Sequence, residues 1–299
     1  MTPVKDTAKK SVKVAAPRRI AFQGAPGAYS DLACRAIFPK AETMPCSGFE
    51  DAFIAVSKGV ADLAMIPIEN TLAGRVADVH HLMPASGLFI IGEHFQPIRH
   101  CLLGTKGAKI EQVKRVHSHV MALPQCRKII REMKLHPVVH EDTAGAAAKV
   151  AHDNDPTQAA IASELAAGIY GLQILKRDVQ DRDDNVTRFV ILSKTPQTPK
   201  LSANPVMSSF VFGVRNIPAA LYKALGGFAT NGINMTKIES YLGEGFSAAK
   251  FLCEVEGHPD DDAMKRAFDE LGFYATDIKL LGTFPLHPFR KTVTSKKQG

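Results

Sequence analysis

Between residues 20 and 192, short runs rich in apolar and β-branched residues alternate with segments in which apolar residues recur at helical spacing. The short runs predict strands at Ile20–Gln23, Leu63–Pro67, Leu88–Ile91, Val113–His117, Pro137–His140, Ala159–Ala162 and Thr187–Leu192. The helical segments predict helices at Tyr29–Ile37, Phe49–Lys58, Ala122–Met133 and Thr143–His152. This alternation favours an α/β fold with parallel strands and crossover helices.

The strand predicted at Thr187–Leu192 is followed by no helix of its own, and we expect it to return to the first sheet. A chain that leaves one α/β lobe, builds a second and then comes back forms two lobes with a cleft between them. We therefore predict a two-lobed domain over residues 19–195, with candidate ligand sites in the cleft.

A proline-rich segment without apolar periodicity follows, and it predicts a linker over residues 196–206. The segments after it read strand, helix, strand, strand, helix, strand: Ser208–Val214, Ala219–Asn231, Met235–Leu242, Ala248–Val255, Asp260–Leu271 and Ile278–Phe284. A βαββαβ order is typical of the ferredoxin-like fold. We predict such a domain over residues 207–285.

The net charge of +7 is carried by the ends of the chain. Residues 1–19 contribute +5 and residues 286–299 contribute +4, which leaves −2 for residues 20–285. We expect basic, disordered tails at residues 1–18 and 286–299. A nearly neutral folded part argues against nucleic acid as a partner, with contact through a tail as the alternative.

The five cysteines are scattered and form no C-x-x-C pair, which signals neither a disulfide framework nor a zinc site. No run approaches the 18 apolar residues of a membrane helix, and the basic N-terminal region has no apolar segment of the secretory type. These features predict a cytoplasmic protein that does not bind membranes.

Small polar residues gather where a predicted strand gives way to a predicted helix. The four places are Gly24–Ser30, Asn70–Arg75, Ser118-His119 and Asp142-Thr143. Helix N-termini expose free N–H groups and the positive end of the helix dipole, so such places suit carboxylates or phosphates. The alternative for each is a simple helix cap.

Thr187 and Arg188 place a hydroxyl and a guanidinium at the entrance of the last strand, where they could serve an anionic ligand or simply belong to strand and surface. Gly24-x-x-Gly27 lacks the third glycine of a dinucleotide fingerprint and the Lys-Ser/Thr of a P-loop. The histidine pairs His80-His81 and His136/His140 lack a matching carboxylate motif, so we predict no metal site.

Five motifs in order resemble prephenate dehydratase, and the resemblance covers roughly residues 19–285. They are Gln23-Gly24-x-x-Gly27-Ala28-Tyr29-Ser30, Pro67-Ile68-Glu69-Asn70-Thr71-x-x-Gly74, His100-Cys101-Leu102-Leu103, Ser118-His119 with Gln125-Cys126, and Asn185-x-Thr187-Arg188-Phe189. The family's catalytic part is like a type 2 periplasmic-binding protein with its active site between the lobes. The segment after the linker is similar to an ACT regulatory domain.

The resemblance implies conversion of prephenate to phenylpyruvate, water and CO2, without metal or organic cofactor, on the route to phenylalanine. By the family's pattern, Thr187 is aimed at the departing hydroxyl and Arg188 orients a carboxylate or neutralises the site. The substrate cradle is then expected from Gly27, Tyr29, Ser30, Asn70, Thr71, Gly74, Ser118, His119, Gln125, Thr143 and Phe189.

The resemblance also implies inhibition by phenylalanine in a homodimer or homotetramer. The implied effector residues are Asn216, Ala220, Leu221, Asn234 and Ser240. Two departures weaken parts of this pattern: Val120-Met121 replaces Pro-Gln after Ser118-His119, and Ala219 replaces a glycine of the effector segment. Arogenate dehydratase, whose substrate differs only by an amino group, is one alternative, and a non-catalytic amino-acid sensor is another.

Overall fold

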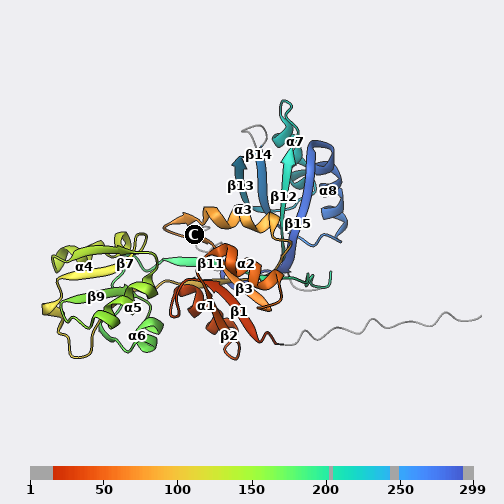
Figure 1. Cartoon of the computed structure of the whole chain (residues 1–299). Coiled ribbons are helices and arrows are strands. Elements are labelled where there is room, and N and C mark those ends of the chain that lie inside the picture. Colours follow the sequence, from red (N-terminus) through yellow and green to blue (C-terminus); the bar gives the residue numbers. More distant parts are fainter. Residues whose placement is uncertain (1–15, 202–204, 243–248, 292–299) are drawn as a thin grey trace, which may run out of the picture.

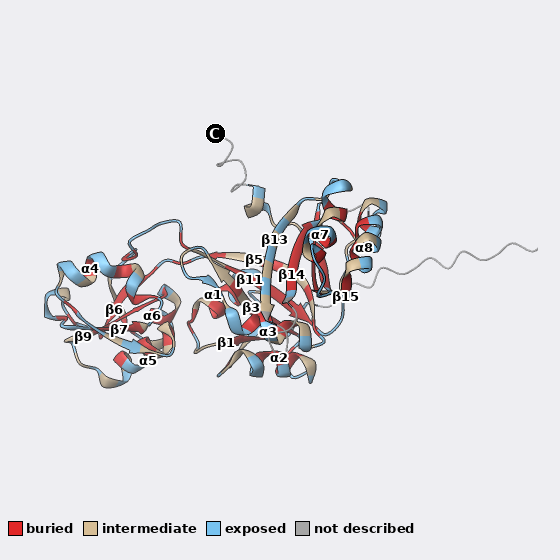
Figure 2. Ribbon diagram, turned by 90° about the horizontal axis from the view of Figure 1, so that it is seen from above, coloured by how far each residue is buried: buried red, intermediate tan, exposed pale blue. Residues whose placement is uncertain are grey.

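The chain builds three β-sheets that follow one another in space (Figure 1). This is a computed structural model, and it describes residues 16–201, 205–242 and 249–291. Two sheets with their helices make the lobes of an N-terminal domain, and the third makes a C-terminal domain. Figure 2 shows the usual segregation, with buried strands inside and exposed helix surfaces outside.

Lobe 1 is built on a sheet with the order β2-β1-β3-β11-β5, in which the short β4 pairs with β3. Its strands are β1 (Arg19–Gln23), β2 (Glu42–Cys46), β3 (Leu63–Asn70), β4 (Gly74–Arg75), β5 (Phe89–Pro97) and β11 (Val186–Ser193). Its helices are α1 (Tyr29–Ile37), α2 (Phe49–Ser57) and α3 (Ala77–Ala85). Strand β11 returns from lobe 2 and lies antiparallel between β3 and β5, as predicted.

Lobe 2 is inserted between β5 and β11, with the sheet order β10-β6-β9-β7-β8. Its strands are β6 (Cys101–Gly104), β7 (Arg115–His119), β8 (His136–His140), β9 (Gln158–Ala162) and β10 (Gln173–Lys176). Its helices are α4 (Arg127–Glu132), α5 (Thr143–Asp153) and α6 (Glu164–Tyr170). One apolar cluster, which includes Phe22 and Met65 of lobe 1 and Ala144 and Ala160 of lobe 2, joins the lobes.

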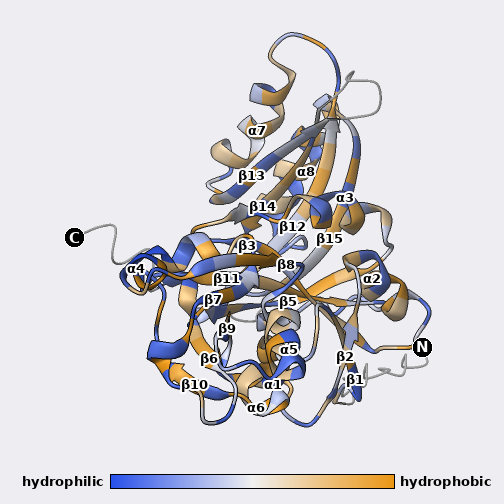
Figure 3. Cartoon of the chain, turned by 60° about the vertical axis from the view of Figure 1, so that its left-hand side comes forward, coloured by the Kyte–Doolittle hydropathy of each residue, from blue (hydrophilic) through white to orange (hydrophobic). Residues whose placement is uncertain are grey.

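The C-terminal domain has the order β13-β14-β12-β15 expected of a ferredoxin-like fold. It comprises β12 (Val206–Val214), α7 (Ala220–Thr230), β13 (Met235–Leu242), β14 (Ala249–Glu256), α8 (Asp262–Tyr274) and β15 (Ala275–Pro285). Stacked phenylalanines, Phe210 and Phe228 among them, fill the space between this sheet and its helices. In Figure 3, α8 shows the alternating polar and apolar colouring of a helix with one buried face.

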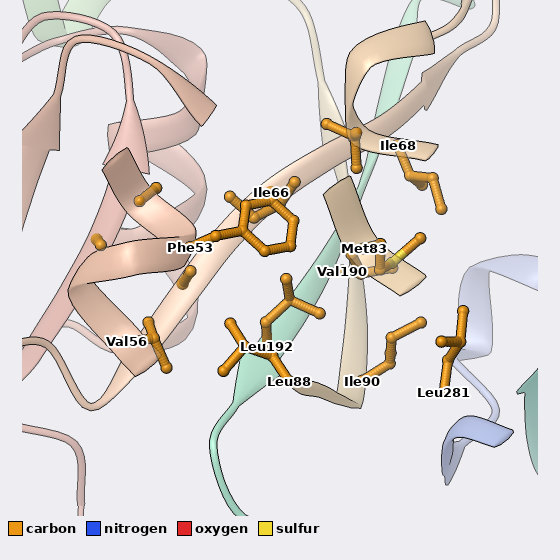
Figure 4. Close-up of a cluster of buried hydrophobic side chains, with 14 of the residues drawn as sticks. Phe53, Val56, Ile66, Ile68, Met83, Leu88, Ile90, Val190, Leu192 and Leu281 are labelled. Atoms are coloured by element: carbon orange, nitrogen blue, oxygen red, sulfur yellow. The ribbon is translucent and has the colours of Figure 1, made fainter. Parts of the chain in front are cut away.

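The other face of the C-terminal sheet packs against lobe 1, so the two domains share one core. Leu252 and Leu281 belong to the same apolar cluster as Ile90 and Leu192 of lobe 1, and Figure 4 shows Leu281 beside Ile90. Gly282 marks a close approach, because a Cβ there would lie 2.0 Å from the carbonyl oxygen of Ile90. The sequence predicted that a linker separates the two domains, but their apolar side chains pack together in one core.

Some elements escaped prediction for identifiable reasons. Strand β2 carries Pro45 at a sheet edge, and α3 carries Pro84 near its end, so both break the usual patterns. The short β4, β6, α6 and β10 offered too few residues for a periodic signal. The predicted helix Ala122–Met133 is divided into a 3-10 turn (Leu123–Cys126) and α4.

The predicted C-terminal tail begins later than residue 286. Phe289 stacks on Phe95 of β5 at a ring distance of 4.7 Å, and Arg290 donates to Glu93 at 2.8 Å. Residues 286–291 therefore fasten the C-terminal end to lobe 1. The rest of that tail, and most of the predicted N-terminal tail, lie outside the described residues.

Candidate active site

Asn70 and Thr187 form a hydrogen-bonded pair where β3 and β11 end beside each other. The two residues are register partners, and Asn70 Nδ2 donates to Thr187 Oγ1 at 2.9 Å. The amide of Asn70 is oriented by its own turn, because Oδ1 accepts from the N–H groups of Leu72 and Ala73 at 2.9 and 2.8 Å. Nδ2 is therefore the end that faces Thr187.

A chain of side chains extends from this pair toward lobe 2. Asn70 Nδ2 also donates to Asn185 Oδ1 at 2.8 Å, and Asn185 Nδ2 donates to Gln125 Oε1 at 2.6 Å. Gln125 Oε1 lies 3.1 Å from His100 Nε2, and His100 Nδ1 lies 2.9 Å from the hydroxyl of Tyr29. This series of hydrogen bonds thus links both lobes at the two segments of the polypeptide that cross between them.

The network is neutral at physiological pH. Burial lowers the pKa of His100 to about 4, so its imidazole is uncharged. Burial also raises the pKa of Tyr29, whose hydroxyl lies 2.7 Å from the carbonyl oxygen of Arg99. A proton on His100 Nε2 can be donated to Gln125 Oε1; because the Tyr29 hydroxyl has a single hydrogen, it must then donate to His100 Nδ1 in place of the Arg99 carbonyl.

The network leaves the hydrogen of Thr187 available. Oγ1 accepts from Asn70, and no protein acceptor for the hydroxyl hydrogen occurs among the residues that the structure describes. A threonine hydroxyl is one donor with two acceptor lone pairs. Thr187 can therefore donate a hydrogen bond to a bound molecule while Asn70 holds its oxygen in place.

Two cavities border the network, the first at Gln125 and the second at Asn70, and the lining of neither includes Thr187. One, of about 290 Å³, lies between the lobes and is lined by Leu72, Ala73, Met121, Pro124, Gln125, Arg127, Asp181 and Arg182. The other, of about 790 Å³, lies between lobe 1 and the C-terminal domain, and its walls include Asn70, Thr71, Gly74, Arg75 and Arg290. Small-molecule sites usually occupy about 300–1,000 Å³, so both are of a relevant size.

Two of the four places predicted to be helix N-termini are helix N-termini in the structure. Tyr29 and Ser30 open α1, and Thr143 opens α5. Their donors are partly used within the protein, since Asp31 accepts from Gly27 N at 2.9 Å and Asp142 accepts from Gly145 N at 2.7 Å. These two places therefore act at least in part as caps.

The other two places are not helix starts. Asn70 ends β3, and the turn after it leads into β4, where Gly74 adopts a φ of +79°. Thr71 joins that turn to the return segment, because its hydroxyl donates to the carbonyl of Asp184 at 2.9 Å. The turn thus carries two predicted substrate residues, Asn70 and Thr71, into contact with the return segment.

Ser118 and His119 lie inside β7 rather than before a helix. Ser118 is fully buried and donates to the carbonyl of Ile161 at 2.6 Å, so it is not placed to hold a substrate. His119 is partly exposed, and burial lowers its pKa. Phe189 is also core, with 1% exposure in the cluster that joins the lobes. The predicted contacts of Ser118 and Phe189 with substrate are therefore corrected.

The prediction that Arg188 orients a substrate carboxylate is also corrected. Successive residues of a strand face opposite sides, and Arg188 points away from the Thr187–Asn70 pair with 3% exposure. Its Nε, Nη1 and Nη2 donate to Glu93, Glu69 and Glu254 at 2.8, 2.9 and 2.8 Å. Arg188 borders the larger cavity, but its donors are engaged by these glutamates.

The predicted effector residues lie at two ends of the C-terminal sheet. Ala220 and Leu221 open α7, after Asn216 in the preceding turn, beyond the end of β12 that is remote from lobe 1. Asn234 precedes β13 at the opposite end and lines the larger cavity. Ser240 lies farther along β13, where its carbonyl accepts from Arg75 at 3.3 Å. Within one chain, Asn234 is thus separated from the rest of the set.

His100 and Asn185 are the network members that the sequence did not single out as site residues. Both stand in motifs at the crossings between lobes, and both are buried at 2% exposure. A polar residue at each crossing of a two-lobed fold was the signal that could have identified them. The five cysteines are free and buried, and no group of three or more possible metal ligands occurs in the described ranges.

A two-lobed α/β domain with a return strand, followed by a βαββαβ domain of the ACT type, defines a class: proteins that join a periplasmic-binding-protein-like domain to an ACT-type domain. The family model described as prephenate dehydratase matches residues 20–197. The chain belongs to the prephenate dehydratase family.

Individual relatives agree. The chain is 51% identical over 275 residues to a "bifunctional N-acyl-homoserine lactone acylase/prephenate dehydratase" of Komagataeibacter europaeus, covering 92% of this chain and 98% of the relative. It is 39% identical to "arogenate dehydratase/prephenate dehydratase 2, chloroplastic" of Arabidopsis thaliana, covering 90% of this chain and 73% of that protein.

Solved structures show the same fold. A structure described as "a novel type of quorum quenching acylases" matches with 51% identity and a TM-score of 0.87, covering 91% of this chain and all of the other. Prephenate dehydratase of Arthrobacter aurescens in complex with L-Phe matches with 28% identity and a TM-score of 0.82, covering 94% of this chain and all of the other. Across the residues described, no helix has the length and apolar character needed to span a membrane.

Proposed function

We propose that this protein converts prephenate to phenylpyruvate, water and CO2. The observation that carries the proposal is the Thr187 hydroxyl, whose oxygen is held by Asn70 while its hydrogen remains available. Family membership supplies the reaction class, and the network supplies a donor for the group that must leave.

The reaction breaks two bonds of the substrate ring. The bond between the ring and its carboxylate breaks, its electron pair restores aromaticity, and the hydroxyl on the opposite ring carbon departs. Hydroxide leaves poorly, so one proton must join that oxygen for water to form. Thr187 is far too weak an acid to be the free proton source near pH 7, and its part is a hydrogen bond that strengthens as charge develops on the departing oxygen.

The interlobe cavity is the proposed substrate site. It is lined by Gln125, whose Oε1 is used by Asn185 while Nε2 has no partner in the described part of the chain. Arg127 brings positive charge to the same cavity, where a carboxylate of the substrate can meet it, whereas Arg182 is paired with Asp184 and Asp181 also lines the cavity. Arg127→Gln should raise KM for prephenate, whereas Arg75→Gln, in the cavity on the other side, is the matched control. The reverse pattern would place substrate in the larger cavity.

Regulation by phenylalanine is the second part of the proposal. The related structure from Arthrobacter aurescens contains L-Phe, and the ACT-type domain here presents Asn216, Ala220, Leu221 and Ser240 at its surface or first helical turn. Assembly as a homodimer or homotetramer would let a second copy complete this site. Calorimetric titration with phenylalanine, alongside its effect on turnover, tests this part.

Two substrate alternatives follow from particular relatives. The plant relatives are named as arogenate dehydratases, and an amino group on the side chain would leave the chemistry at Thr187 unchanged. The relative from Komagataeibacter europaeus is named as a bifunctional acylase and is similar over nearly its whole length. Assays with prephenate, arogenate and an N-acyl-homoserine lactone separate these activities, and binding without any turnover would favour the non-catalytic sensor.

A further inference from the structure

A buried cluster of six charged side chains joins lobe 1 to the C-terminal domain. Its carboxylates are Glu69, Glu93 and Glu254, and its cations are Arg188, Lys237 and Arg290. The side chains of Glu93 and Glu254 are fully buried, those of Arg188, Lys237 and Arg290 are 3%, 10% and 19% exposed, and that of Glu69, at the edge, is 35% exposed. The three negative and three positive formal charges of the six balance, and at the edge Lys237 also pairs with Glu239 at 3.2 Å.

Besides the contact of Arg290 with Glu93, the cluster crosses the domain boundary at two places. Arg188 of β11 donates to Glu254 of β14 at 2.8 Å, and Lys237 of β13 donates to Glu69 of β3 at 2.5 Å. Burial opposes ionisation of Glu69, but the charges of Arg188 and Lys237 outweigh it and lower its pKa to about 2. Glu69 is therefore ionised at neutral pH, and the second crossing is an ion pair.

Each of these two crossings involves a residue that is adjacent in sequence to Thr187 or Asn70. Glu69 directly precedes Asn70, and Arg188 directly follows Thr187. Because Asn70 and Thr187 face one side of the sheet while Glu69 and Arg188 face the other, each member of the pair has its backbone anchored from behind. A shift of the C-terminal sheet would act on both members at once.

Stability alone does not account for such a cluster. Buried ion pairs contribute little net stability over well-packed apolar residues, because desolvation offsets the attraction between the charges. Their geometry, however, is specific: three glutamates around one planar guanidinium fix its position in three directions. The same surface already has an apolar core to hold the domains together.

We propose that Glu254 and Lys237, both in the C-terminal domain, are positioning residues for the Thr187–Asn70 pair. The inference rests on the proposed function. The C-terminal domain then holds the hydroxyl of Thr187 in its working place through Arg188, and holds Asn70 through Glu69. Any ligand that displaces β13 or β14 changes catalysis by this path.

The test compares Glu254→Gln with Glu256→Gln, which lies on the same strand, is exposed and outside the cluster, and lines the larger cavity rather than the proposed substrate site. Glu254→Gln keeps the size of the side chain and removes its charge. It should lower kcat for prephenate by roughly 10- to 100-fold, the scale of a small misplacement of reacting groups, with little change in KM. Glu256→Gln should leave both constants within about twofold of the starting protein, the spread of context effects at a surface site.

A second background separates positioning from general damage. If Glu254 acts through Thr187, then Glu254→Gln should have little further effect in a Thr187→Val protein, because the two changes remove one function. Equal effects of Glu254→Gln in both backgrounds would overturn the proposal. So would unchanged kcat in Glu254→Gln with a normal melting temperature. Lys237→Met, at the edge of the cluster, provides the same comparison if Glu254→Gln does not fold.

Hydrogen exchange provides a readout that does not need turnover. Amides of the ends of β3 and β11 should exchange faster in Glu254→Gln than in Glu256→Gln, and unchanged exchange there would refute positioning. If the unmodified protein converts neither prephenate nor arogenate while this exchange effect is present, the proposed function fails and the positioning stands. If turnover is normal and neither kcat nor exchange responds to Glu254→Gln, the positioning fails and the function stands.

Discussion

Replacing Thr187 with valine removes one hydroxyl while keeping a β-branched side chain in β11. The change has two energetic consequences, and the structure separates them. Asn70 Nδ2 loses Thr187 Oγ1 as an acceptor but keeps Asn185 Oδ1 at 2.8 Å and the carbonyl of Val186 at 3.3 Å. No donor is left unsatisfied, so the stability cost is that of one ordinary hydrogen bond, about 1 kcal/mol.

That cost is small beside a typical unfolding free energy of about 5–15 kcal/mol, so the protein should remain folded. The chemical consequence is larger, because the proposed donor to the departing oxygen is lost. A positioned group that assists proton movement is worth roughly 10²–10⁴ in rate, or about 2.7–5.4 kcal/mol at 1.36 kcal/mol per tenfold. We therefore expect kcat to fall by that factor while KM and the melting temperature change little.

The assay follows phenylpyruvate by its absorbance in alkali after incubation with prephenate. Thr187→Ser is the matched control, because it restores the hydroxyl and should recover most of the turnover. A Thr187→Val protein within threefold of normal kcat would show that the hydroxyl does not take part in the reaction. A fall in melting temperature large enough to explain the loss of activity would point to a structural role instead.

Three further predictions follow from the fold. Ala219 holds a φ of +61° at the start of α7, a left-handed conformation that glycine adopts more easily than alanine. Ala219→Gly should therefore stabilise the protein by about 0.5–1 kcal/mol and raise the denaturant midpoint of unfolding, and a lower midpoint would refute strain at this position. A chain ending at Lys194 lacks Leu281 of the shared core and Glu254, the ion-pair partner of Arg188. Circular dichroism and solubility should therefore report a poorly folded product, and a cooperative transition at the melting temperature of the full-length protein would contradict this. The pKa of Glu69 is lowered from 4.5 to about 2, so its contribution to stability is present above pH 4.5 and is lost as the pH falls through 2. Glu69→Gln should therefore show a smaller fall in melting temperature over that range than the unmodified protein, and parallel curves of melting temperature against pH for the two proteins would refute the effect.

The sequence predicted the architecture well because its signals were local and repeated. The return of residues 187–192 to the first sheet and the βαββαβ order after residue 206 are both confirmed. Periodicity could not show what happens between domains. Leu252 and Leu281 read as ordinary strand residues, and nothing in their spacing reveals that the face they occupy packs on lobe 1.

The candidate site was predictable in part for a related reason. Asn70 and Thr187 stand at strand ends in recognisable motifs, and the structure brings them into contact. Arg188 stands next to Thr187 in sequence, but strand alternation turns it to the opposite side, where Glu254 from a distant segment accepts its hydrogen bond. A linear motif does not say which of its members share a face.

The close approach at Gly282 limits how this regulatory domain could be exchanged with that of another protein. A transplanted domain with any side chain at that position would collide with the backbone of Ile90 and be held away from lobe 1. A working chimaera would have to carry the glycine and the apolar face around it, and also a carboxylate facing Arg188. Joining two foreign domains at the proline-rich connection would preserve the covalent chain but not the packing between lobe 1 and the C-terminal sheet, so the two domains would have to be exchanged together.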